Sequence, residues 1–162
     1  MSASLSPEEA IPYLSESLLK FVSGLVSTIS GYVNVFLDRG DHDSCQAILR
    51  WGIEVLDGLR EADKPNYLDK IRAVMLAVLA GSQFLSKQSD EAHDTLIKAK
   101  ELAAFFDAAP SYDESDVRFV GRIEGASAHD DMGATAAEAV DRAINEFEDE
   151  GFTALWRTVN EG

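Results

Sequence analysis

The sequence predicts an all-α fold of stacked antiparallel helical hairpins with a helical cap at the C-terminal end, and three observations lead to it. Apolar residues recur at intervals of three and four residues through most of the chain, which is the period of a helix that buries one face. Polar turns around residues 40 and 88 separate such segments, so each pair of helices folds back on itself. The two pairs also share a residue pattern, which indicates an internal repeat.

The composition and the first hairpin set the scale of the fold. With 46% hydrophobic residues the chain can bury one core, so we expect a single helical domain over residues 1–162. Gly40 follows the first helix in the position where helices commonly end, and Asp41 or Asp43 can cap the second. Small residues in the first helix either allow close packing of a neighbouring helix or form a face for a ligand: Ser23, Gly24, Ser27, Ser30 and Gly31.

The second hairpin begins at Pro65, so that residues 12–107 hold two hairpins. The apolar stripe of its first helix extends to Leu85, and Ser89 with the acidic residues that follow it begins its second helix. Pro110 ends that helix, because proline cannot continue one.

Residues 108–162 are expected to form a loop and capping helices. An alanine-rich helix covers residues 134–150, and Gly151 breaks it. A short helix over residues 152–159 follows, with Trp156 as its anchor. Such a cap covers the open end of a helical stack.

The second helices of the two hairpins share a pattern of small and large residues. A constant separation of 47 residues relates the two copies: Cys45, Leu49, Gly52 and Leu56 correspond to Ala92, Leu96, Ala99 and Ala103. A small residue, a large one four positions on and a small one three positions later let one helix nest closely against its neighbour.

This pattern resembles the second helix of a tetratricopeptide repeat. The residues that carry the resemblance are Gly40-x-His42-x-x-Cys45-x-x-x-Leu49-x-x-Gly52-Ile53, and Ala92-x-x-x-Leu96-x-x-Ala99 repeats its core. The interval of 47 residues is longer than the family's, and His42 stands where the family has an aromatic residue. The resemblance implies a right-handed stack whose inner face, built from the first helix of each pair, holds a peptide or a small ligand.

The tail resembles the C-terminal helical regions of bacterial helix-turn-helix regulators. The stretches that carry this second resemblance are FDAAPSYDESDVRFV, ASAHDDMGATAAEAV and ALWRTV. It implies a regulatory module of a transcriptional regulator, separate from the part that binds DNA. Within this tail, residues 116–123 fit a strand and a helical turn equally well.

The net charge of −15 excludes some partners and leaves others. An acidic surface repels phosphates, so we expect no direct contact with nucleic acid. Residues 105–162 alone carry a net charge of −10. Their acidic side chains form either a solvated surface or a face for a basic partner. Cys45 is the only cysteine and the start has no signal-peptide pattern, so we expect a cytoplasmic chain that does not enter a membrane. The sequence leaves open whether the chain forms a homodimer.

No residue pattern predicts catalysis, a metal site or a cofactor. His42 and Cys45 supply two of the four ligands that zinc needs, and Cys45 falls on the buried stripe. His129-Asp130-Asp131 with Glu124 is the densest polar cluster, and it fits acid–base chemistry or a divalent ion less well than helix capping and a solvated histidine. We therefore expect a protein that is not an enzyme.

Helical phase gives the candidate partner-binding residues. They belong to the first helix of each hairpin, one turn away from the buried stripe: Ser27, Ser30, Asn34, Gly81 and Gln83. Small residues would form a floor on which Asn34 and Gln83 hydrogen-bond a peptide backbone. Substituting these two should weaken partner capture without unfolding the chain.

The sequence is compatible with three functions. The first is a domain that binds a protein or peptide, as the effector part of a bacterial transcriptional regulator. The second is a small-molecule sensor with an apolar pocket between the long helices. The third is an enzyme working through His129–Asp131. An open groove, a closed cavity or a titratable cleft would distinguish them.

Overall fold

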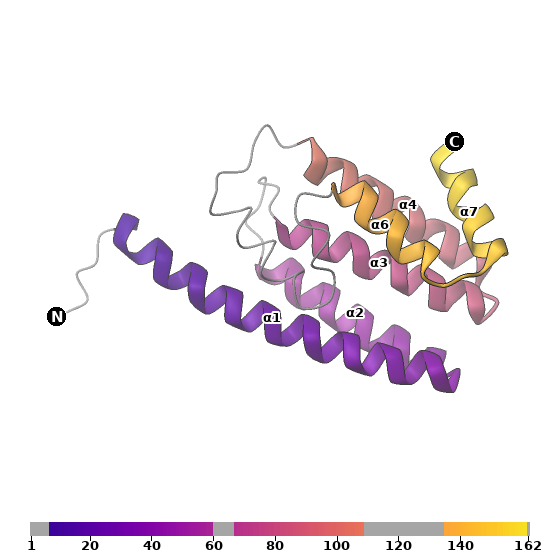
Figure 1. Cartoon of the computed structure of the whole chain (residues 1–162), viewed down its shortest axis with the longest axis horizontal. Coiled ribbons are helices and arrows are strands. Elements are labelled where there is room, and N and C mark those ends of the chain that lie inside the picture. The colour runs from indigo at the N-terminus through magenta and orange to yellow at the C-terminus, as the bar shows by residue number, and fades with distance from the viewer. Residues whose placement is uncertain (1–6, 60–66, 109–134, 162) are drawn as a thin grey trace.

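The structure is a computed structural model that describes residues 7–59, 67–108 and 135–161; for residues 7–19 and 67 it describes the backbone alone. Within these ranges all regular structure is helical, with no strand, which confirms the all-α prediction. The six helices are α1 (Pro7–Arg39), α2 (His42–Leu59), α3 (Tyr67–Leu85), α4 (Ser89–Asp107), α6 (Ala136–Asn145) and α7 (Glu150–Glu161). The first helix thus begins earlier than residue 12, and it is the longest (Figure 1).

The helices pack in the order of the sequence. In the described part of the chain α1 packs on α2, α2 on α3 and α3 on α4, while α6 lies against α3 and α4, and α7 against α4 and α6. Figure 1 shows α1 along one edge of this layer, with its N-terminal half projecting beyond the other helices. Among the described residues α1 contacts mainly α2, and α4 contacts mainly α3, α6 and α7, so the first four helices pack as two successive hairpins.

The two turns share one geometry. Gly40 has φ of +69°, and backbone N–H groups of Gly40 and Asp41 donate to the carbonyls of Leu37 (3.1 Å) and Phe36 (2.8 Å). Lys87 has φ of +67°, with the equivalent bonds from Lys87 to Phe84 (3.0 Å) and from Gln88 to Gln83 (2.8 Å). Both helices thus end in a left-handed residue that satisfies their last carbonyls. The two left-handed residues are 47 apart, the separation of the sequence repeat.

The repeated pattern is buried as expected. All eight of its residues are buried: Cys45, Leu49, Gly52, Leu56, Ala92, Leu96, Ala99 and Ala103. Gly52 shows why a small residue stands there, since a Cβ at this position would collide with the Ile29 side chain of α1. The first half of the core lies between α1, α2 and α3, and the second between α3, α4, α6 and α7.

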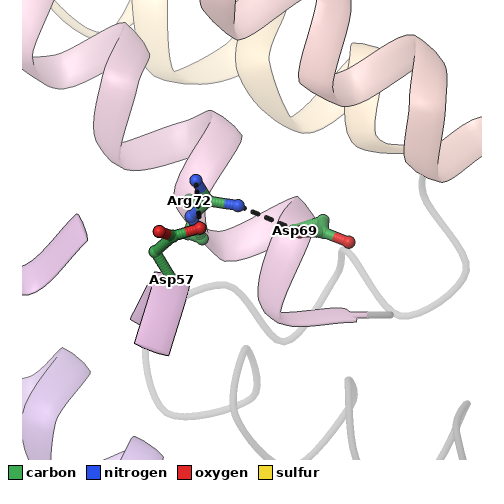
Figure 2. Close-up of polar contacts among 3 residues, drawn as sticks. All are labelled: Asp57, Asp69 and Arg72. Atoms are coloured by element: carbon green, nitrogen blue, oxygen red, sulfur yellow. Dashed lines mark hydrogen bonds and ion pairs between the residues drawn. The ribbon is translucent and has the colours of Figure 1, made fainter. Parts of the chain in front are cut away.

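An arginine joins the end of α2 to the start of α3. Arg72 of α3 donates from Nη1 to Oδ1 of Asp69 at 3.1 Å, and its Nη2 lies 3.2 Å from Oδ1 of Asp57 in the last turn of α2 (Figure 2). Asp69 is fully buried, whereas the Asp57 side chain is 58% exposed. This clamp links the last turn of α2 in the first hairpin to α3 in the second.

The tail holds two short capped helices, and its break is not where the sequence placed it. α6 ends at Asn145 and α7 begins at Glu150, so Gly151 lies inside α7 and the prediction that it breaks the helix is wrong. The chain turns instead at Glu148, which has φ of +52°. Asp149 then accepts the Phe152 N–H at 3.0 Å and caps α7. A side-chain cap explains the restart better than glycine does.

The last two helices are fixed to the second hairpin. Asp107 at the end of α4 accepts the backbone N–H groups of Ala136 (2.8 Å) and Ala137 (3.0 Å), so α4 caps α6. Trp156 is buried, and its indole N–H donates to Oδ1 of Asp141 at 3.1 Å. Phe152 packs in the core against Phe84 and Phe147. The predictions for residues 116–123 and for His129–Asp131 fall outside the described residues.

Candidate groove between helices α1, α3 and α6

A groove of about 420 Å³ runs between α1, α3 and α6. The side chain of Leu49 from α2 also lines it. It exists because α1 packs on α2 while α6 packs on α3 and α4, so that α1 and α6 flank α3 from two sides. The volume lies within the range of ligand sites in proteins, about 300–1,000 Å³.

The walls of the groove are mostly apolar. Twelve of its seventeen lining residues are apolar, so a partner would bury apolar surface there. They are Val26, Ile29, Val33, Leu37, Leu49, Ile71, Val74, Met75, Val78, Ala139, Ala143 and Phe147. The wall thus combines branched aliphatic side chains with one thioether and one ring.

Polar groups stand on the two outer helices. Ser30 and Asn34 are exposed on α1, and Arg142 and Glu146 are exposed on α6. The fifth polar lining residue, Lys70 of α3, is only 2% exposed. An apolar floor between polar rims is the usual arrangement of a protein interface.

Two of the five predicted partner-binding residues line this groove. Ser30 and Asn34 lie one turn apart on the rim that α1 forms. Ser27 is exposed on the same helix and is not among the lining residues. The role of these residues in binding stays a prediction.

The other two predicted residues lie elsewhere. Gln83 is buried, and its Oε1 accepts a hydrogen bond from the Thr95 hydroxyl of α4 at 2.7 Å. Gly81 is buried under the ring of Phe147, which a Cβ at position 81 would strike. Both therefore serve packing around α3, and substitution of Gln83 would disturb the α3–α4 contact.

Gly81→Ala is expected to lower the free energy of unfolding by about 1–3 kcal/mol, because the added methyl group displaces the Phe147 ring from its place against Phe152. The matched control is Gly58→Ala, in a helix where nothing lies within 4 Å of the added carbon. That variant should gain up to about 1 kcal/mol from helix propensity. Urea unfolding followed by circular dichroism measures both, and equal effects would contradict the close approach at Gly81.

A polar cluster bridges α2 and α3. His42 Nδ1 lies 3.1 Å from the Ser82 hydroxyl, and Gln46 Nε2 donates to Ser86 Oγ at 3.2 Å. Burial raises the pKa of the Cys45 thiol, although a hydrogen bond with Ser82 acts in the opposite sense. Ser82 and Cys45 are fully buried, so neither is open to a substrate. The cluster holds the two helices together.

The start of α2 is capped as expected. Asp41 Oδ1 accepts the Ser44 N–H at 3.2 Å. Hydrogen bonds from Ser44 hold the pKa of Asp41 below its usual value. Among the described residues no group of three or more His, Cys, Asp or Glu is placed to hold a metal ion.

Sequence reasoning missed the α3 and α6 walls of the groove. On α3 the lining face is set by Ile71, Val74 and Val78, whereas the prediction followed small and polar residues at the other end of the helix. On α6 the signal was available, since Ala139, Ala143 and Glu146 recur at helical spacing. It was assigned to a cap.

No family model matches this chain, and neither a curated protein nor a solved structure matches it.

Proposed function

We propose that this chain is a non-enzymatic interaction domain that holds an apolar segment of a protein partner in the groove between α1, α3 and α6. The observation that carries the proposal is the apolar floor between two polar rims. Such a groove suits an amphipathic helix, which lays side chains at positions i, i+3, i+4 and i+7 into it.

The origin of the groove walls supports a stack of the tetratricopeptide kind. Each wall comes from the first helix of a hairpin: α1, α3 and α6 precede α2, α4 and α7. Leu49 is the one lining residue that a second helix supplies in the described structure. An inner face made of first helices is what the resemblance of residues 40–53 implies. The likeness of the tail to bacterial regulators supports a place as the effector part of a transcriptional regulator, which a DNA-binding segment in the same reading frame would test.

The second candidate is a small-molecule sensor, and the groove's volume favours it. About 420 Å³ with mainly apolar walls accommodates a small amphipathic molecule. Polar side chains of α1 and α6 stand beside those walls, where the polar end of such a molecule would lie. The two candidates use one site, so one pair of variants tests both.

Filling the groove should abolish binding. Ser30→Trp places an indole on the α1 rim, at an exposed residue where it leaves folding intact. The probe is a displayed library of amphipathic helical peptides, from which binders to the unchanged chain are selected and labelled. We expect Ser30→Trp to raise the dissociation constant of these peptides by at least about 30-fold in fluorescence anisotropy.

The matched control is Ser27→Trp, the same change one turn away on the same helix and outside the groove lining. It should change the constant by less than about threefold. Equal losses in both variants would contradict the groove as the site. The sensor function is tested by the shift in melting temperature with a panel of small apolar carboxylic acids. The second candidate is favoured over the first if an acid raises the melting temperature of the unchanged chain but not of Ser30→Trp, and if no selected peptide loses affinity in Ser30→Trp.

A further inference from the structure

The C-terminal half of α1 contains a long uncharged segment in a strongly charged protein. The chain has a net charge of −15, yet the seventeen residues from Phe21 to Leu37 include no Asp, Glu, Lys or Arg. Segment Lys20–Arg39 is the one stretch of the described residues that is long and apolar enough to cross a membrane, and only 22% of its window is buried. Most of this apolar helix therefore faces away from the core.

The exposed part of this segment holds large side chains. Phe21 and Tyr32 are each 52% exposed and Val35 is 44% exposed. The Tyr32 ring stacks on Phe36 with centroids 5.9 Å apart, which fixes its position. Neighbouring apolar side chains on a surface mark a site of interaction with a partner.

The spacing of the exposed residues is symmetric. Phe21, Gly24, Thr28, Tyr32 and Val35 are all exposed and recur at intervals of three and four, so they form one stripe, named here the outer stripe of α1. Nothing lies within 4 Å of a Cβ built at Gly24, so the space over this glycine is open. Thr28 is the centre of this symmetry. Gly24 and Tyr32 lie four residues before and after it, and Phe21 and Val35 lie seven residues before and after it.

We propose that the outer stripe of α1 binds the same stripe of a second copy of this chain, with the two helices antiparallel and crossing at Thr28. In that pairing the Tyr32 ring of each copy lies in the open space over Gly24 of the other, and Phe21 of each lies against Val35 of the other. A twofold interface requires such self-complementarity, in which residue i contacts j and j contacts i. Large residues opposite small ones also satisfy close helix packing.

Charge favours a second copy over other occupants. Two chains of net charge −15 repel each other wherever acidic surface meets, and the outer stripe is an uncharged surface on which they can approach. A basic partner would be drawn to the acidic C-terminal part instead. A bilayer is disfavoured because Val22, Ile29 and Val33 bury the other side of the helix in the core, and anionic lipids repel this chain.

The expected contact is modest. The outer stripe extends from Phe21 to Val35, a length of about 21 Å at 1.5 Å per residue. This is smaller than a permanent dimer interface, so a reversible dimer with a dissociation constant in the roughly micromolar range is expected. The stripe lies on the side of α1 away from Ser30 and Asn34, so dimer formation leaves the groove open.

Sedimentation equilibrium between about 1 µM and about 500 µM tests the pairing, since this range brackets the expected constant. The unchanged chain should dimerise, and Tyr32→Glu should raise the dissociation constant at least about 30-fold because each dimer contains the change twice. Ser27→Glu adds the same charge to an exposed residue outside the stripe and should leave the constant within about threefold. Circular dichroism confirms that both variants fold.

A mixing experiment tests the register. Gly24→Lys alone should also weaken self-association, whereas Tyr32→Glu and Gly24→Lys chains mixed together should associate more tightly than either alone, because the introduced charges then oppose each other. A monomer at every concentration, a dimer that Tyr32→Glu leaves unchanged, or mixing without gain would each overturn the proposal. Binding to neutral phosphatidylcholine vesicles that Tyr32→Glu removes, without a dimer, would assign the stripe to a membrane instead.

Discussion

Arg72→Met is expected to lower the free energy of unfolding by about 3 kcal/mol or more, because it removes a cation from beside a buried carboxylate. Asp69 is fully buried, and the Arg72 side chain that contacts it is 14% exposed. Methionine keeps much of the aliphatic volume, so the loss reports charge and hydrogen bonding more than packing. Urea unfolding followed by circular dichroism gives the value.

Two controls separate the buried contact from the exposed one. Asp57→Asn removes the other partner of Arg72, whose side chain is 58% exposed, and should cost less than about 1 kcal/mol. The double variant Asp69→Asn/Arg72→Met leaves no buried charge at this pair and should recover part of the loss. If Asp57→Asn cost as much as Arg72→Met, the clamp between α2 and α3 would be the main effect and the buried pair a minor one.

Asp57→Asn should also affect peptide binding in the groove. Asp57 lies in the last turn of α2 and Arg72 in the second turn of α3, so their ion pair links the two hairpins (Figure 2). The α1 rim and the α3 wall of the groove belong to different hairpins. Asp57→Asn should therefore reduce the free energy of peptide binding by more than it reduces the free energy of unfolding.

The sequence predicted the hairpins well where a local rule decides the structure. Glycine is the residue that tolerates a left-handed conformation best, so Gly40 marked the first turn. The polar residues around position 88 predicted the second turn as well, but the residue type of Lys87 does not indicate the left-handed conformation that it adopts there. The repeat of small and large residues revealed the buried faces of α2 and α4, because a close helix contact demands that spacing.

The groove was harder to predict because distant segments build it. Ser30 and Asn34 follow from the helical phase of α1 alone. Gly81 met the rule for a small-residue floor, but Phe147 from the tail covers it, and nothing local positions that ring over α3. Gln83 met the rule for a polar contact but hydrogen-bonds Thr95 instead. Phase within one helix is readable from the sequence, whereas which neighbour covers a face depends on the whole packing.

Trp156→Ala should cost about 3–5 kcal/mol in the unfolding of the C-terminal hairpin, since it removes a buried aromatic side chain from the contact of α7 with the core. It also leaves Asp141 without the indole donor, a minor term because Asp141 is exposed. Trp51→Ala is the matched control: the same change at a side chain that is 50% exposed should cost less than about 1 kcal/mol. Circular dichroism during urea unfolding compares the two.

A more specific test is to determine which helices Trp156→Ala destabilises. In a stack in which each hairpin contacts only its neighbours, loss at one end leaves the other end folded. Cys45 is the only cysteine, lies buried in the first hairpin and is labelled by thiol reagents only when that hairpin opens. Trp156→Ala should therefore speed hydrogen exchange in α6 and α7 while the labelling rate of Cys45 stays within about threefold of the unchanged chain. A rise of roughly a hundredfold or more, matching the full 3–5 kcal/mol, would mean that the chain unfolds as one unit and that the hairpins do not behave as a repeat array.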